Sequence, residues 1–154
     1  MSDIVSPDQR SKMMAGIRGK GTKPELLVRK LLFASGFRYR LHRNDLPGTP
    51  DVVMPGRRIV IFVHGCFWHQ HLECKYARLP SSNSDFWHQK LGRNVQRDQE
   101  VFAALKAAGW RILVVWECAT RSRPAIAALT SLMSQWIESD VPTGEISLSQ
   151  ILDN

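Results

Sequence analysis

The fold is decided by the stretch Asp51-Val-Val-Met-Pro-Gly-Arg-Arg-Ile-Val-Ile-Phe-Val-His64. Residues Ile59–His64 are almost all apolar, which is typical of a central strand covered on both faces. Before them, Asp51–Met54 predicts a short strand and Pro55-Gly56 a tight turn, because such turns favour Pro followed by Gly. Two antiparallel strands joined in this way bring Asp51 and His64 to neighbouring points of one sheet edge.

The flanking segments predict three helices and two more strands. The helices span Lys23–Ser35, Asp85–Ala108 and Ala125–Ile137, and the strands span Phe37–Leu41 and Arg111–Trp116. Because a helix separates Arg111–Trp116 from Ile59–His64, we expect these two strands to be parallel. The order predicts an α/β fold in which helices flank both faces of a central mixed β-sheet. The core side of the long helix is predicted to carry Phe86, Leu91, Val95, Phe102 and Leu105.

Size and composition are those of one soluble domain with a basic surface. The chain has 154 residues, of which 44% are hydrophobic and 23% charged, and its net charge is +7. A protein this basic is attracted to polyanions, of which nucleic acid is the commonest, although charge alone also fits an unspecific basic surface. We divide the chain into a basic N-terminal arm over residues 1–20, a domain over residues 21–140 and a C-terminal tail over residues 141–154.

The chain shows no targeting segment. Its N-terminus lacks an apolar stretch of signal-peptide length, and the longest apolar run, Ile59–Val63, is far too short to span a bilayer. We therefore expect a cytosolic protein without a membrane partner, in which thiols stay reduced. Cysteines of such a protein serve as metal ligands or buried thiols more often than as disulfides.

All three cysteines are predicted to gather around one metal ion. Cys66 and Cys74 lie close together on irregular backbone, and Cys118 follows a strand that is expected to lie beside the central strand. With one histidine they match the tetrahedral chemistry of structural Zn²⁺, which would hold the irregular loop to the sheet. Spacing leaves open whether His69 or His71 is the fourth ligand, and the alternative is three buried free thiols.

Asp51 stands at the start of a strand, where its carboxylate suits Mg²⁺, an ion that prefers oxygen ligands and keeps several waters. Such an ion activates water and stabilises charge on a phosphodiester. A Pro-Asp pair alone is also an ordinary turn. The arrangement resembles the core of restriction enzymes, in which Pro-Asp and a turn precede an acid-x-Lys strand. Here the corresponding residues are Phe62-Val63-His64, so the second acid is missing and histidine replaces lysine.

Aromatic residues lie among positive charges in the middle of the chain. Phe67 and Trp68 are adjacent in a loop, and Trp87 lies near the start of the long helix. At steps of four residues that helix carries a polar stripe, formed by Lys90, Asn94 and Asp98. Exposed aromatics flanked by cations suit insertion between DNA bases. A satellite core and a solvated helix face explain the same pattern equally well.

Taken together, these motifs resemble the very short patch repair (Vsr) endonucleases of bacteria. The likeness extends from Arg10 to about Arg121 and leaves Pro142–Asn154 uncovered. It rests on Leu46-Pro-Gly-x-Pro-Asp51, Phe62-x-His-Gly-Cys-Phe-Trp-His69, Phe86-Trp87-x-x-Lys-x-Gly-x-Asn94-Val-x-Arg-Asp98, Gly109-Trp-Arg and Val115-Trp-Glu-Cys118. The resemblance implies a restriction-endonuclease-like fold for the domain. It also implies an enzyme that needs Mg²⁺ and nicks double-stranded DNA 5′ to the thymine of a T:G mismatch, which initiates very short patch repair.

The same resemblance assigns roles to the residues of a catalytic centre. Mg²⁺ would be held by Asp51, assisted by the carbonyl oxygen of Val63. The hydrolysis would be assisted by His64 and His69. Asp98 would orient His69, because a carboxylate partner fixes the tautomer of an imidazole.

Two further residues acquire a role only through the resemblance. His71 becomes the fourth Zn²⁺ ligand, because His69 is engaged with Asp98. Glu25 matches a family acid near the site. The sequence Thr22-x-x-Glu25 is also a capping box, so Glu25 acts as a catalytic support, a helix cap or both.

The implied DNA contacts come from both grooves. On the major-groove side, the aromatic wedge would consist of Phe67, Trp68 and Trp87. Met14, or Met13 beside it, would enter from the minor groove. Lys90 and Asn94 would lie near the mismatched pair. The partner is then double-stranded DNA with a T:G mismatch, bound by a monomer in the bacterial cytoplasm at the nucleoid, with other mismatch-repair proteins as further partners.

Two other functions fit parts of the pattern. A restriction-type endonuclease that cuts a specific matched sequence would need the same Asp51 and metal. A non-catalytic DNA-binding module stapled by zinc is favoured by the missing second acid. Cleavage of matched and mismatched duplexes, with and without Mg²⁺, separates these possibilities.

Overall fold

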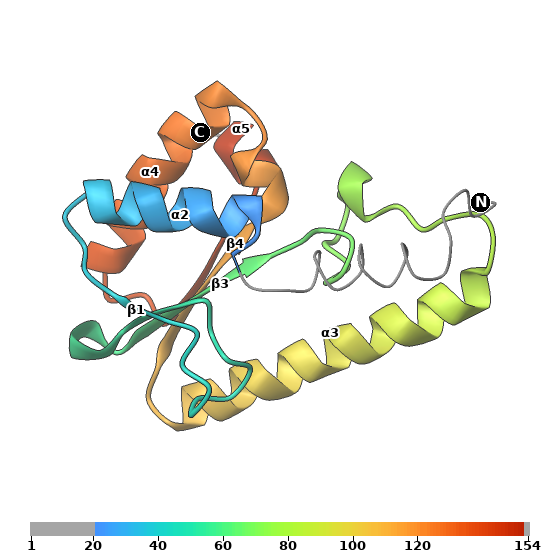
Figure 1. The fold of residues 1–154 in the computed structure, drawn as a ribbon, viewed down its shortest axis with the longest axis horizontal. Coiled ribbons are helices and arrows are strands. Elements are labelled where there is room, and N and C mark those ends of the chain that lie inside the picture. Colours follow the sequence, from blue (N-terminus) through green and yellow to red (C-terminus); the bar gives the residue numbers. More distant parts are fainter. Residues whose placement is uncertain (1–20, 153–154) are drawn as a thin grey trace.

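Among residues 21–152, which the structure describes, five strands form one mixed sheet in the order β1-β2-β3-β4-β5 (Figure 1). The structure is a computed structural model. The strands are β1 (Arg40–Leu41), β2 (Val52–Met54), β3 (Ile59–His64), β4 (Arg111–Trp116) and β5 (Thr143–Ile146). The helices are α2 (Lys23–Ala34), α3 (Ser84–Ala107), α4 (Arg123–Glu138) and α5 (Leu148–Leu152). Short 3-10 helices are η1 (Pro55–Arg57), η2 (Lys75–Ala77) and η3 (Glu117–Thr120).

The pairing of the strands confirms the predicted topology at the centre of the sheet. β2 lies antiparallel to β3, with Val52 opposite Ile61, and β3 lies parallel to β4 over its whole length. β1 pairs antiparallel with β2, and β5 pairs parallel with β4. His64 and Trp116, the last residues of β3 and β4, are register partners. The start of β2 therefore shares one edge of the sheet with the ends of β3 and β4.

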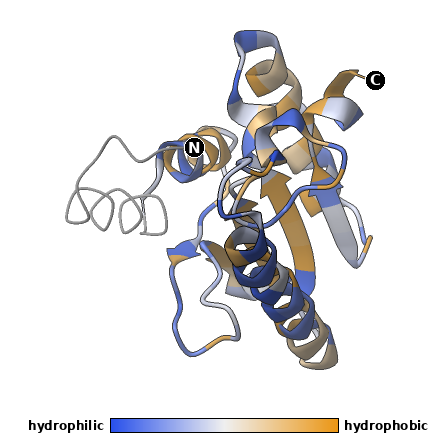
Figure 2. Cartoon of the chain, turned by 90° about the vertical axis from the view of Figure 1, so that its right-hand side faces the viewer, coloured by the Kyte–Doolittle hydropathy of each residue, from blue (hydrophilic) through white to orange (hydrophobic). Residues whose placement is uncertain are grey.

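Helices cover both faces of the sheet, as the sequence predicts. Ile59 and Ile61 of β3 pack on the face that α2 and α4 cover. Val60 and Phe62 pack on the opposite face, where α3 contributes Leu105. The strands are the most hydrophobic part of the chain, whereas most of α3 is hydrophilic (Figure 2). Within residues 21–152, no helix combines the length and the apolar character needed to cross a membrane.

The first described helix begins and ends where its end signals predict. Thr22 caps α2, because its Oγ1 accepts a hydrogen bond from the backbone N–H of Glu25 at 3.4 Å. Ser35 is the C-cap, and Gly36 follows with φ +95°, a left-handed value that glycine adopts without strain. The cap places Glu25 in the first turn of α2, where the residue is only 2% exposed.

Two local predictions differ from the structure. The tight turn between β2 and β3 is the 3-10 helix η1, and its left-handed residue is Arg58, with φ 55°, instead of Gly56. The strand predicted over Phe37–Leu41 is limited to Arg40–Leu41, because β2 offers only a short partner. Phe37 is instead buried in the core on the α2 side of the sheet.

The segment predicted to be a C-terminal tail, residues 141–154, contributes β5 and α5. β5 pairs with β4 from Ile112 opposite Thr143 to Val115 opposite Ile146. Its sequence gave little sign of this, because an edge strand of four residues contains Gly144 and buries only Ile146. Residues 143–146 form a strand because they pair with β4, and not because their composition favours a strand.

Phe86 was predicted to face the core but is 53% exposed. The reason is visible in Figure 1, where the N-terminal part of α3 runs past the sheet and has no core to pack against. Leu91 and Leu105, further along the same helix, are buried as predicted. Val95 and Phe102 are half-buried.

Candidate functional site

Within residues 21–152, three clusters of ionisable side chains lie near the edge where β3 and β4 end. In each cluster the atoms that could bind a metal lie within 4.8 Å of one another. The Asp51 cluster consists of Glu25, His42 and Asp51. The His69 cluster consists of His64, His69 and Asp98. The cysteine cluster consists of Cys66, His71, Cys74 and Cys118.

Asp51 is held in place by the loop before it and by the strand beside it. Gly48 has φ +74°, and a Cβ atom there would lie 2.5 Å from Cγ1 of Val101, so the loop packs closely on α3. Oδ2 of Asp51 accepts a hydrogen bond from the backbone N–H of Val63 at 2.7 Å. Burial raises the pKa of Asp51 to about 7, an effect that the Val63 N–H opposes and the charge of Glu25 increases. A cation beside Asp51 would stabilise the ionised carboxylate.

Glu25 lies both in the first turn of α2 and in the Asp51 cluster. Its Oε1 accepts a hydrogen bond from the backbone N–H of Gly21 at 3.3 Å, which is the contact of a helix cap. Its Oε2 accepts from Nη1 of Arg29 at 3.3 Å and lies 2.8 Å from Nε2 of His42. The capping carboxylate is therefore also a member of the Asp51 cluster.

His42 is a member of the Asp51 cluster that the sequence analysis missed. Its Nε2 lies 2.8 Å from Oε2 of Glu25 and 4.0 Å from Oδ1 of Asp51. The register of β1 on β2 pairs Arg40 with Val53, so its extension by two residues places His42 opposite Asp51. Pairing the two predicted strands in this register was the signal that could have found His42. The backbone N–H of His42 indeed donates to the carbonyl oxygen of Asp51 at 3.3 Å.

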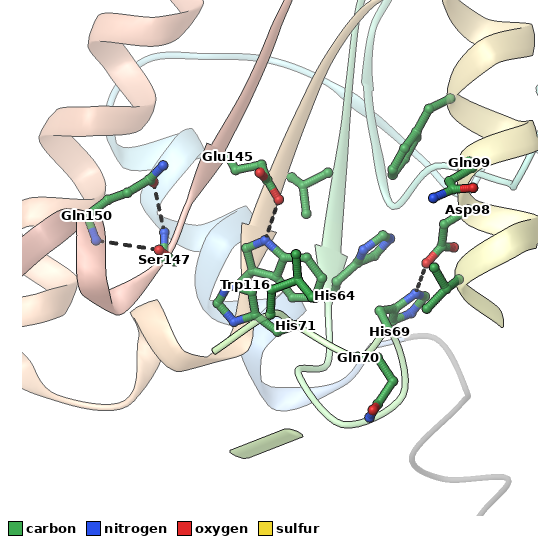
Figure 3. A pocket seen from close by; sticks show the side chains of 14 residues that line it. His64, His69, Gln70, His71, Asp98, Gln99, Trp116, Glu145, Ser147 and Gln150 are labelled. Carbon is green, nitrogen blue, oxygen red and sulfur yellow. Dashed lines mark hydrogen bonds and ion pairs between the residues drawn. The ribbon is translucent and has the colours of Figure 1, made fainter. Parts of the chain in front are cut away.

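The His69 cluster lies on the α3 side of β3. Nδ1 of His69 lies 2.6 Å from Oδ2 of Asp98, and the rings of His64 and His69 stack at 3.7 Å with an angle of 4° (Figure 3). Burial, with a smaller contribution from the charge of His69, lowers the pKa of His64 well below its usual value, so this imidazole is neutral. Within residues 21–152, no hydrogen-bond partner lies near Nδ1 of His64. The cluster borders a cavity of about 330 Å³.

The cysteine cluster has two buried and two half-buried members. Cys66 and Cys118 are buried, all three cysteines are free thiols, and Sγ of Cys118 lies 3.7 Å from Nδ1 of His71. A hydrogen bond between Cys66 and Cys118 lowers the pKa of Cys118 to about 5 and raises that of Cys66. The His71 ring stacks on Trp116 at 4.1 Å. The set of three sulfur atoms and one imidazole nitrogen is the donor set of structural Zn²⁺ sites.

The loop that carries His69 and His71 also depends on Gln70, which the sequence analysis did not single out. Nε2 of Gln70 donates to the carbonyl oxygens of Phe67 at 2.7 Å and of Ala77 at 3.2 Å. Gln70 has φ 49°, so the backbone turns sharply between the two histidines. This turn separates them, and as a result His69 faces Asp98 while His71 lies among the cysteines.

The aromatic residues form one half-buried group between the loop and α3. The ring centroids of Phe67, Trp68 and Trp87 lie 5.1–5.9 Å from one another. Phe86 extends the group, since its ring lies 5.1 Å from that of Trp87. Nδ2 of Asn94 donates to the carbonyl oxygen of Trp68 at 3.1 Å and so fixes the loop to the helix.

Lys90 and Met14 are the remaining predicted DNA contacts. Lys90 is half-buried on α3, one turn before Asn94, and so lies on the same side of the helix as the aromatic group. Met14, with Met13, lies outside the described residues.

Comparison with known proteins places these features in one family. The family described as DNA mismatch endonuclease Vsr matches residues 2–76. The Type II nicking enzyme V.XorIIP of Xanthomonas oryzae is 52% identical over 83% of this chain and 93% of its own length. The DNA mismatch endonuclease Vsr of Escherichia coli is 39% identical over 98% of this chain and 97% of its own length. The Type II nicking enzyme V.NmeAIP of Neisseria meningitidis is 43% identical over 80% of this chain and 87% of its own length.

Proposed function

The chain belongs to the Vsr family and is a DNA endonuclease, and on this premise we propose that it nicks double-stranded DNA 5′ to the thymine of a T:G mismatch. The nick would initiate very short patch repair, and the mixed sheet with its helices would be a restriction-endonuclease-like fold. One observation carries the proposal. The backbone N–H of Val63 donates to Asp51, and the next residue, His64, belongs to the His69 cluster. The proposed cation site at Asp51 and the pair His64 and His69 therefore lie next to each other at the end of β3.

The Asp51 cluster fits a hard divalent cation, because two of its three members are carboxylates. We assign Mg²⁺ to Asp51 and to the carbonyl oxygen of Val63, with Glu25 as support beside them. When bound, the ion supplies a Lewis acid and an acidified water for the hydrolysis of a phosphodiester. The side chains of the site would orient the phosphate and accept the proton that the attacking water releases.

His69 is arranged to accept a proton. A carboxylate accepts hydrogen bonds, so the 2.6 Å contact with Asp98 places the proton of the neutral imidazole on Nδ1 of His69. Its Nε2 then carries the free lone pair and can take a proton from water. His64 stacks on the same ring and stays uncharged, so it can offer a hydrogen bond to the phosphate without a competing positive charge.

Selection of a mismatch is assigned to the aromatic group. A T:G wobble pair stacks less well than a matched pair, so driving Phe67, Trp68 and Trp87 into the base stack costs less there. Asn94 holds the Trp68 backbone, and with Lys90 it would lie near the mismatched pair. Met14 of the basic arm, or its neighbour Met13, would enter from the minor groove. Alignment of the scissile phosphate with Asp51 would then depend on this insertion.

Zn²⁺ is assigned to the cysteine cluster, where it would be structural. Four protein donors leave no open position on a tetrahedral ion, so this site would take no part in the reaction. The site would hold the loop that carries His69 and Trp68. We further propose that the protein acts as a monomer and that other mismatch-repair proteins use the nick.

A single nicking assay tests the function. Full-length protein is incubated with duplexes that are end-labelled on either strand and carry one T:G pair or the matched T:A pair in the same sequence, with Mg²⁺ or with a chelator. We expect a nick 5′ to the thymine, only in the mismatched duplex and only with Mg²⁺. Absence of strand scission under every condition would contradict the proposal.

A second candidate function is sequence-specific nicking of matched DNA. It is favoured by the names of two similar proteins, each described as a Type II nicking enzyme. The same catalytic residues would serve, and only the role of the aromatic group would change. Equal rates on the T:A and T:G duplexes in a library of sequence contexts would support this alternative over mismatch recognition.

A further inference from the structure

His42 lies outside every motif that carries the resemblance to the family, yet its imidazole reaches the centre of the Asp51 cluster. The side chain is 14% exposed, and its Nε2 is directed at both carboxylates of the cluster. Glu25 does not need this contact for the helix cap, because Gly21 and Arg29 already bind its two oxygens. The imidazole also faces Asp51, at 4.0 Å from its Oδ1, where a second role is open to it.

We propose that His42 is a nitrogen ligand of the divalent cation held by Asp51, so that this centre binds Mn²⁺ in preference to Mg²⁺. The inference rests on the proposed function for the presence of a cation at Asp51. It adds a ligand and an ion preference that the family motifs do not contain.

The distances suit one shared ion. Donor atoms bound to an ion at about 2.1 Å lie between about 3 and 4.2 Å apart, depending on whether they are adjacent or opposite. Nε2 of His42 lies 4.0 Å from Oδ1 of Asp51, and the donor atoms of all three cluster members lie within 4.8 Å of one another. To ligate the ion, Nε2 of His42 would give up its 2.8 Å hydrogen bond to Glu25, and the imidazole would carry its proton on Nδ1, so that Nε2 offers a lone pair.

The backbone at His42 supports a functional role. Its φ is 47°, in the left-handed region, although histidine has no glycine-like freedom there. Such a conformation persists when the surroundings determine it. Here the hydrogen bond from the His42 N–H to the Asp51 carbonyl oxygen, at 3.3 Å, holds the two residues side by side. The residue with this uncommon backbone conformation, His42, is also the one whose imidazole faces the carboxylates of Glu25 and Asp51.

The choice of ion follows from the donor chemistry. Mg²⁺ takes oxygen ligands, whereas the first-row transition ions, of which Mn²⁺ is the weakest binder in the series, also take an imidazole nitrogen. A centre of two carboxylates alone would discriminate weakly between Mg²⁺ and Mn²⁺. Addition of the His42 nitrogen raises the affinity for Mn²⁺ and leaves that for Mg²⁺ nearly unchanged.

Metal binding without DNA tests this inference. Full-length protein with its cysteine cluster loaded with Zn²⁺, as verified by elemental analysis, is titrated with Mn²⁺ while free Mn²⁺ is followed by electron paramagnetic resonance. The Mg²⁺ affinity is measured by competition. We expect His42→Gln to weaken Mn²⁺ binding by about 10-fold or more and Mg²⁺ binding by less than about 3-fold. The matched control His88→Gln, at an exposed histidine on α3, should change neither.

A spectroscopic measurement keeps the test independent of the stability of the variant. Electron spin-echo modulation of Mn²⁺ bound to the wild type should show coupling to ¹⁴N, and His42→Gln should remove it. Equal weakening of Mn²⁺ and Mg²⁺, or ¹⁴N coupling that is absent in the wild type or persists in His42→Gln, would overturn the inference. Neither measurement uses DNA, so failure of mismatch nicking with intact ¹⁴N coupling would count against the proposed function alone.

Discussion

The cysteine cluster and the Asp51 cluster lie at the same end of the sheet, but they differ in how they are closed. The cysteine cluster offers four donors, which is the full complement of a tetrahedral ion. The Asp51 cluster offers three, two of them hard carboxylates, and leaves positions for water and phosphate. The comparison indicates that soft donors which fill every position of an ion suit a structural site. Hard donors that leave positions free suit a site where a reaction takes place.

The two clusters also differ in what holds their members in place. Asp51 and His42 are held by strand pairing and Glu25 by a helix cap, all of which exist without a metal. Cys66, His71 and Cys74 instead lie on an irregular loop that is held by side-chain hydrogen bonds and not by strand pairing. Loss of a ligand should therefore remove activity at the Asp51 cluster and local structure at the cysteine cluster.

The largest expected effect comes from Asp51→Asn. We expect nicking of a T:G duplex to fall by about 10³-fold, because an amide lacks the charge that holds the cation. The amide oxygen can still accept the Val63 N–H, so the fold and the binding of mismatched DNA should remain. Single-turnover nicking with Mg²⁺ and a gel-shift assay measure the two effects. Full activity of this variant would refute the assignment of the metal to Asp51.

The same variant should have lower activity than the wild type, but its metal-free form should be more stable at high pH. Burial raises the pKa of Asp51 to about 7 from its ordinary value of 3.8, so the unfolded chain releases this proton more readily than the folded one. Without metal, stability is therefore lost as the pH rises from about 4 through about 7. Asp51→Asn removes this loss and should raise the melting temperature at about pH 8, with an advantage that shrinks toward about pH 4. Thermal unfolding in a chelator checks this sign.

At the cysteine cluster, Cys118→Ser should lose the bound metal and lower the free energy of unfolding by about 3 kcal/mol. The loop that carries His69 and Trp68 would then open, so proteolysis should concentrate at residues 66–77. Elemental analysis, denaturant unfolding and limited proteolysis measure these effects. Undiminished zinc in Cys118→Ser would dismiss the closed site, and Cys74→Ser should repeat the loss if one ion binds all four donors.

A smaller effect is expected from Trp68→Ala, which leaves both clusters intact. Loss of one stacking ring should lower the ratio of T:G to T:A nicking rates by about 10-fold. Zinc content and the melting temperature should stay close to those of the wild type. The control Phe33→Ala removes an exposed aromatic on α2, away from this group, and should leave the ratio unchanged. If Trp68→Ala also keeps the wild-type ratio, Trp68 takes no part in selecting the mismatch.

The smallest effect is expected from Gly48→Ala, which tests the loop before Asp51. A Cβ there would meet Val101 at 2.5 Å, and φ is +74°, so we expect a loss of about 1–2 kcal/mol of stability. Gly56→Ala is the matched control, because nothing lies within 4 Å of its Cβ position. Denaturant unfolding compares the two variants. Equal stability would show that Asp51 does not depend on the close packing of this loop.

Much of the sheet was predictable because its central strands are continuous apolar runs. Ile59–His64 and Arg111–Trp116 have the predicted bounds, and α2 begins and ends at its predicted caps within one residue. Phe86 was misplaced because an apolar helix position predicts burial only where a core lies opposite. β5 was missed because Thr143–Ile146 becomes a strand through its partner β4.

By itself, the sequence determined the central strands, the helices and the soft donors of the cysteine cluster. These depend on local periodicity and on side-chain chemistry that few residue types share. Only the tertiary structure decided that His42 meets Glu25 and Asp51, that His69 and His71 part on either side of Gln70, and that residues 143–146 complete the sheet. Each of these depends on which distant segments lie side by side, and a local pattern of residues does not contain that information.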